Sequence, residues 1–176
     1  MKLQKAGLVG LAAALAAVGI AAPSIAGGNK YTAVSDSRDC GDGDTVVLNG
    51  PLKLWPPNHK FVDEPVTATD ADGAGPVELT LMPDVQDASG GDGGSNHDPD
   101  FNATSEDGET LVATGDGSAT AGLQLRAERS GKGDGRTYVI NWTAMFDDKT
   151  CSSGDEGQTP FVIEVPHDMR GGADWK

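Results

Sequence analysis

The chain has 176 residues and a formal net charge of −14, because 27 Asp and Glu outnumber 13 Lys and Arg. This acidic balance argues against partners that bind basic surfaces, namely nucleic acids and anionic membranes. The 25 Gly and 10 Pro, beside only 5% aromatic residues, indicate short strands joined by many turns rather than helices.

Residues 1–26 have the pattern of a secretory signal peptide. Two lysines precede an apolar run at 6–22, and the small residues Ser24 and Ala26 offer a cleavage site. The alternative is a membrane anchor, since the run approaches the ~20 residues that a spanning helix needs. Pro23 and the polar residues after it favour cleavage. We therefore expect a secreted or periplasmic protein with no membrane segment after cleavage.

The segment that follows, residues 27–44, is acidic and carries one cysteine. Its four aspartates, Asp36, Asp39, Asp42 and Asp44, are interpreted as an exposed turn rather than as a site.

Beyond residue 44 the apolar residues recur with a period of two, which is typical of strands. In chain order, the expected strands are 45–48, 62–68, 77–82, 110–113, 123–127, 138–146 and 161–165. This pattern predicts an all-β fold, an antiparallel immunoglobulin-like β-sandwich of about seven strands with one long acidic, Gly-rich loop. The expected organisation is a signal peptide at 1–26, an acidic segment at 27–44, the sandwich at 45–168 and a C-terminal tail at 169–176.

Cys40 and Cys151 are the two cysteines of the chain. In an oxidising compartment the simplest interpretation is one disulfide, and simple up-and-down strand alternation brings both to one pole of the sandwich. The alternative is two free thiols or a metal-binding pair.

The segment 84–108 is long for a connection in a compact domain and is rich in acidic residues. Calcium prefers oxygen ligands on a chain that wraps around it, so the segment predicts a calcium site although it contains no EF-hand motif. The candidate ligands are Asp84, Asp87, Asp92, Asp98, Asp100, Glu106 and Asp107. The alternative is a solvated acidic loop without an ion.

Three histidines offer a second kind of metal site. Strand alternation places His59, His97 and His167 at the pole opposite the cysteines, with Asp168 beside the last of them. Imidazoles with a carboxylate suit zinc or copper. The alternative is that each histidine forms a hydrogen bond within its own turn.

The sequence has no motif of an activated nucleophile, such as G-x-S-x-G or H-E-x-x-H. We therefore expect no catalytic residues, and a carboxylate-dependent hydrolase is the remaining enzymatic alternative. Arg126 and Glu128 would share a strand face, and the expected role of these charges is a cross-strand ion-pair ladder. Tyr138 lies where a tyrosine corner would lie in an immunoglobulin-like sandwich, or else it is ordinary core.

Three strings, LWPPNHK at 54–60, LRAERSGKGDGRTY at 125–138 and VPHD at 165–168, form a combined signature. In this order they resemble the immunoglobulin-like or HYR-like modules found, often as repeats, in large secreted bacterial proteins. The resemblance spans residues 48–170, and the long Asp/Gly segment departs from the usual pattern. It implies a β-sandwich with an extracellular structural, adhesive or binding role and no catalytic residues.

The sequence thus predicts a secreted, calcium-stabilised module with a surface, matrix or ligand-binding role, whose partner is an extracellular protein or glycan. The alternative function is an exported protein that binds zinc or copper through its histidines.

Overall fold

The computed structural model describes residues 34–87, 99–103, 105, 108–128, 135–147 and 149–166. The chain divides into two units, residues 1–30 and 31–176, and all described residues belong to the second. They form eleven strands and no helix, so no helix among them is suited to cross a membrane. The predicted all-β class is confirmed.

The strands form two main antiparallel sheets. Sheet A has the order β1 (Val34–Asp39), β2 (Thr45–Gly50), β4 (Val66–Thr69) and β7 (Ser118–Ala121). Sheet B has the order β10 (Lys149–Ser152), β9 (Gly135–Phe146), β5 (Pro76–Asp87) and β6 (Leu111–Asp116), with β11 (Phe161–Pro166) also beside β9. A third, two-stranded sheet pairs β3 (Phe61–Asp63) with β8 (Gln124–Arg126).

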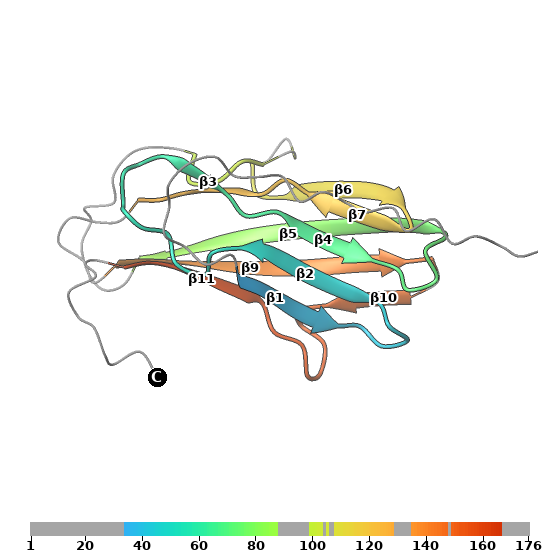
Figure 1. Cartoon of the computed structure of the whole chain (residues 1–176). Coiled ribbons are helices and arrows are strands. Elements are labelled where there is room, and N and C mark those ends of the chain that lie inside the picture. The colour runs from blue at the N-terminus through green and yellow to red at the C-terminus, as the bar shows by residue number, and fades with distance from the viewer. Residues whose placement is uncertain are drawn as a thin grey trace, which may run out of the picture. The chain divides into compact units, whose positions relative to one another are not determined.

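Sheets A and B bury their facing sides in one hydrophobic core. Figure 1 shows β1, β2 and β4 of sheet A as a layer in front of β5 and β9 of sheet B. In β9 the expected alternation holds, since Tyr138, Ile140 and Trp142 are fully buried. The Trp142 indole N–H donates to the Thr159 carbonyl over 3.1 Å, which satisfies the one polar group of that buried ring. The arrangement is consistent with the expected β-sandwich.

The number of strands differs from the expected seven, because the described residues contain eleven. The segment 62–68 is two strands, β3 and β4, separated by Glu64 and Pro65. Proline lacks the N–H that a continuous ladder requires. Strands β1, β7 and β10 were not predicted, because β1 is polar, β7 has only the small Ala119 and Ala121 on its buried side, and β10 is short and mostly polar.

Two predicted boundaries also differ. Strand β1 lies inside the segment 27–44, which was expected to precede the sandwich, and pairs with β2 along its whole length. Strand β5 continues to Asp87, so the first residues of the expected long loop are part of sheet B, where they pair with β9.

The predicted disulfide is confirmed. Cys40 and Cys151 are bonded, with their Cα atoms 5.8 Å apart. Cys40 directly follows β1, and Cys151 lies in β10, so the bond joins an edge of sheet A to sheet B. It closes a loop whose ends are separated by 111 residues.

Replacing both cysteines, as Cys40→Ser with Cys151→Ser, is expected to lower the free energy of unfolding by about 4–5 kcal/mol, because a long closed loop restricts the unfolded chain. Urea unfolding of the variant, beside the reduced wild-type chain, measures this loss. A loss below about 1 kcal/mol would contradict a stabilising role of the bond.

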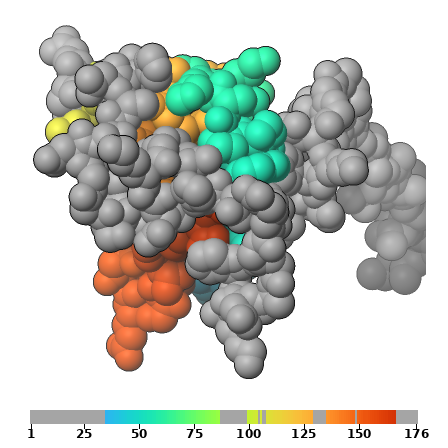
Figure 2. Space-filling view, turned by 90° about the vertical axis from the view of Figure 1, so that its left-hand side faces the viewer, coloured from blue at the N-terminus to red at the C-terminus, as the bar shows by residue number. Residues whose placement is uncertain are grey.

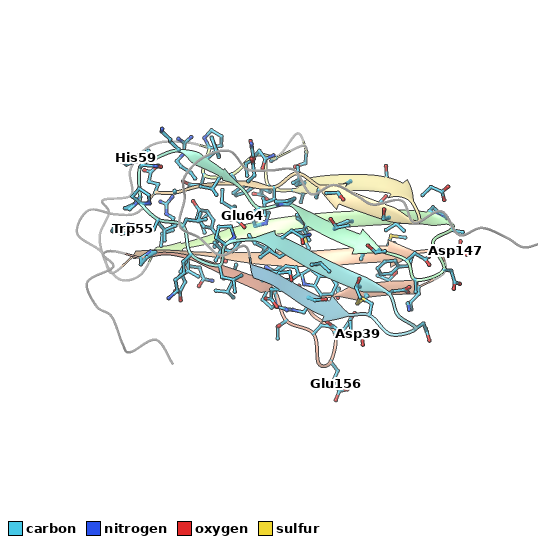
Figure 3. All side chains as sticks on the ribbon, viewed as in Figure 1. Asp39, Trp55, His59, Glu64, Asp147 and Glu156 are labelled. Atoms are coloured by element: carbon cyan, nitrogen blue, oxygen red, sulfur yellow. A yellow bond between two sulfur atoms is a disulfide. The ribbon has the colours of Figure 1, made fainter. Side chains whose placement is uncertain are left out.

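Glu64 is a carboxylic acid enclosed between the strands. Its side chain is fully buried, and neither carboxyl oxygen has a hydrogen-bond partner (Figure 3). A Cβ built on Gly50 would lie 1.7 Å from Glu64 Oε2, so the glycine provides the space for this carboxyl group. Burial, with a smaller contribution from the charge of Asp63, raises the pKa of Glu64 to about 9. The group is therefore protonated in the folded protein at neutral pH.

This buried acid predicts a specific pH dependence of stability. Between the ordinary pKa of 4.5 and the folded value of about 9, the folded chain holds a proton that the unfolded chain releases. The free energy of unfolding therefore falls as the pH rises, by up to about 1.4 kcal/mol per pH unit, and levels off above the folded pKa.

The substitution Glu64→Gln removes this titration. The difference in unfolding free energy between variant and wild type should grow in favour of the variant from pH 4.5 to pH 9. Urea unfolding across this range measures the difference, and a difference that does not change with pH would show that Glu64 is ionised in the folded state.

Candidate functional site

The described parts of the three signature strings meet at one end of the sandwich, where Val165 and Pro166 pair with Arg136 and Gly135. The Leu54 N–H donates to the Glu164 carbonyl over 2.7 Å, and the His59 N–H donates to the Ala127 carbonyl over 3.0 Å. The Ala127 N–H in turn donates to the Lys60 carbonyl over 2.8 Å. Figure 2 faces this end, where the teal segment before β3 lies beside the orange residues near β8. We name this end the signature pole, defined by residues 52–61, 99–102, 123–128, 135–138 and 163–166.

Arg126 connects the segments of the signature pole. Its Nε donates to the Pro99 carbonyl over 3.0 Å, and its NH1 donates to the His59 carbonyl over 3.1 Å. Its guanidinium carbon lies 4.5 Å from the centre of the Phe61 ring, and its Nε lies 3.7 Å from Glu128 Oε2. A planar guanidinium suits such simultaneous stacking and hydrogen bonding. The expected cross-strand ladder is not what the described residues form: Arg126 lies beside Glu128 itself, which follows the end of β8 and is fully buried.

A second buried arginine lies on the same pole. Arg136 is 4% exposed, and its NH1 donates to Asp100 Oδ1 over 2.5 Å. The hydroxyl of the fully buried Tyr138 donates to the Arg126 carbonyl over 2.7 Å. Burial raises the pKa of Tyr138 to about 12, against the opposing effect of Arg136, so the hydroxyl remains a donor at neutral pH. The pole therefore pairs two guanidiniums with two carboxylates.

His59 lies on the surface of the signature pole and has a buried carboxylate behind it. Its Nδ1 is 3.5 Å from Glu128 Oε2, and its side chain is 52% exposed while that of Glu128 is fully buried. Neither carboxyl oxygen of Glu128 has a hydrogen bond. The φ angle of His59 is 61°, a left-handed conformation that is uncommon outside glycine. A carboxylate at one ring nitrogen is the usual second partner of a metal-binding histidine.

The other predicted transition-metal ligands, His97, His167 and Asp168, lie outside the described residues. Sequence reasoning did not connect Glu128 with His59, because the two residues are far apart in the chain. The pairing of β3 with β8 brings them together.

The predicted calcium ligands are described only in part. Asp92, Asp98, Glu106 and Asp107, and the side chain of Asp87, lie outside the described residues. Asp84 is exposed on β5 and accepts a hydrogen bond from the Gln86 amide over 3.2 Å. The carboxylate of Asp100 is bound by Arg136. Within the described ranges, no three or more His, Cys, Asp or Glu side chains are grouped so as to hold a metal ion.

The opposite end of the sandwich carries an acidic pocket of about 280 Å³. Its charged lining consists of Asp42, Asp44, Asp70, Asp72, Asp147 and Lys149. Figure 3 shows Asp147 at this end and His59 at the other. Asp44 was expected in an exposed turn, but it is 7% exposed, because residues distant in sequence enclose it.

Lys149 is an internal counter-ion for this pocket. Its Nζ lies 2.6 Å from Asp44 Oδ2 and 3.3 Å from Asp42 Oδ2. The Asp44 carboxylate also accepts the Ala71 N–H over 2.9 Å. This backbone hydrogen bond, followed by Lys149, lowers the pKa of Asp44, and the bond from Asp44 raises the pKa of Lys149. Both groups are therefore charged at neutral pH.

No protein-family model matches the chain, and a search of curated proteins also finds no match.

The substitution Arg126→Lys keeps the charge but loses the planar fork that reaches two carbonyls and stacks on Phe61. We expect the free energy of unfolding to fall by about 1–3 kcal/mol, because two hydrogen bonds to backbone carbonyls and the stacking on Phe61 are lost together. Urea unfolding measures the loss. Wild-type stability of this variant would show that a positive charge alone holds the pole together.

Proposed function

We propose that this chain is a secreted, immunoglobulin-like β-sandwich module with a surface, matrix or ligand-binding role. The Cys40–Cys151 disulfide carries the proposal, because such bonds persist in oxidising compartments outside the cytoplasm. The signal peptide expected at residues 1–26 agrees with this location.

The signature pole supports the same role. Its three strings resemble HYR-like modules, and they meet in one structure that Arg126 and Arg136 join through hydrogen bonds and ion pairs. These side chains support the architecture of the pole, which agrees with a binding module rather than an enzyme.

Calcium stabilisation by the acidic segment after β5 is a further part of the proposal. Asp84, near the end of β5 that leads to that segment, is an exposed carboxylate that accepts a hydrogen bond from the uncharged side chain of Gln86. Neighbouring carboxylates repel one another, and a divalent cation that binds the folded chain relieves this repulsion and raises stability by mass action.

The second candidate function, zinc or copper binding, is favoured by the geometry of His59. The buried Glu128 carboxylate beside its Nδ1 would orient the ring and increase its basicity toward a metal. His97, His167 and Asp168 are the further ligands that this function requires.

Thermal unfolding of the oxidised protein in chelator, then with calcium, tests the calcium proposal. We expect about 1 mM calcium to raise Tm by several degrees. The substitution Asp84→Asn should reduce the rise, whereas Glu156→Gln, which removes one exposed negative charge elsewhere, should preserve it. An unchanged Tm with calcium would refute this part of the proposal.

The same measurement with zinc or copper separates the second candidate. A rise at micromolar zinc that His59→Gln abolishes would favour the histidine site over the acidic segment. If the rise persists in His59→Gln, His59 is not a ligand.

A further inference from the structure

Exposed apolar side chains gather on the outer face of sheet B. Within the described residues five large apolar side chains are exposed, and Met82, Val112, Met145 and Val162 lie on this face. They are 38–48% exposed. The fifth, Phe61, is stacked against Arg126 at the signature pole. Apolar side chains concentrated on one face of an acidic protein are typical of an interaction surface.

The strand register gives Met82 and Val112 uncharged partners on the neighbouring strands. Thr80 of β5 is paired with Val112 on one side and Thr143 on the other. Met82 is paired with Asn141 in β9. Residues directly opposite each other in antiparallel strands point to the same face, so these side chains form the centre of the outer surface.

The charged residues of this face lie around that centre, and they are acidic. Glu78 is paired with Met145, Asp84 with Val139, and Glu164 of β11 lies 3.7 Å from Lys53. The described outward positions in the strands of sheet B include no Lys or Arg. A complementary surface therefore has an apolar centre with basic residues around it.

A cavity of about 210 Å³ opens at the rim of this face. Its lining includes Pro76, Glu78, Thr114, Gly115, Met145 and Asp147. The carboxylates of Glu78 and Asp147 supply negative charge, and Met145 supplies an apolar wall. The turn that carries Asp147 is fixed to β5, because the Asp147 N–H donates to the Pro76 carbonyl over 3.1 Å. A long basic side chain matches this lining, since its methylene stem packs on apolar surface while its head reaches a carboxylate.

We propose that the outer face of sheet B binds a basic extracellular protein segment, with a Lys or Arg side chain of that partner in the cavity between Glu78 and Asp147. This inference rests on the binding role proposed above and specifies its partner. A second copy of this chain is a poorer occupant, because it would bring the same acidic rim against Glu78 and Asp84.

The test uses the oxidised protein with labelled Met and Val methyl groups, followed by NMR. The probe is the peptide acetyl-Val-Lys-Val-Arg-amide, and its control is acetyl-Val-Glu-Val-Glu-amide. We expect the methyl signals of Met82, Val112 and Met145 to shift with the basic peptide and not with the acidic one. Glu78→Gln should weaken binding at least about fivefold, and Glu156→Gln, the same change on a different surface, less than about twofold.

Four results would overturn the proposal. Equal weakening by Glu78→Gln and Glu156→Gln would mean that the net charge alone attracts the peptide. Shifts of the same methyl groups with protein concentration, without peptide, would make a second copy the occupant. Peptide-induced shifts confined to other residues would support a binding role but place it on another surface. The absence of a shift with either peptide would count against both this face and its proposed partner.

Discussion

The guanidinium of Arg126 joins three segments that are far apart in the sequence. It donates to the carbonyls of Pro99 and His59 and stacks on Phe61, while the Arg126 carbonyl accepts the hydroxyl of Tyr138. Connections at the end of a sandwich lack the regular ladder that satisfies strand carbonyls, and side chains can supply donors there in addition to the backbone N–H groups. One rigid, permanently charged side chain meets this need for several carbonyls at once.

At the other end of the sandwich a basic side chain again joins separate segments, because Lys149 forms ion pairs with Asp42 and Asp44. The chain has 13 basic residues for 27 acidic ones, and several of the basic residues serve as internal counter-ions at the two ends of the strands. The centre of the outer face of sheet B is in contrast uncharged. This distribution keeps the ends of the sandwich folded despite the net charge and leaves a broad strand face for contact with a partner.

The sequence predicted the features that depend on the local alternation of apolar residues or on the expected export of the chain. Strands β9 and β11 follow from their alternating apolar residues, and the Cys40–Cys151 bond follows from export and strand direction. Strand β1 was not predicted, because its residues VSDSRD carry no apolar alternation and its pairing with β2 determines its structure. The burial of Glu64 and Asp44 also depends on distant residues, and composition alone marks both as surface acids.

The candidate sites also combine features that local sequence patterns predicted with features that depend on residues distant in the chain. The described parts of the signature strings meet around Arg126 and Arg136, which the sequence alone did not connect. The partnership of His59 with Glu128, and the cavity beside Glu78, result from strand register that no local pattern encodes. The predicted calcium ligands Asp84 and Asp100 differ in surroundings, since one is exposed and the other is bound by Arg136.

The central claim is that the contacts of Arg126 and Arg136 hold the signature pole together without added calcium. Amide hydrogen exchange of the oxidised protein, compared in chelator and in calcium, tests this claim most directly. The amides of Leu54, His59 and Ala127 are each hydrogen-bonded across the pole. Measured relative to the core amide of Ile140, they should exchange equally slowly in both conditions. Faster exchange of these amides in chelator, beyond any change at Ile140, would contradict the claim and show that the pole is built around a metal ion.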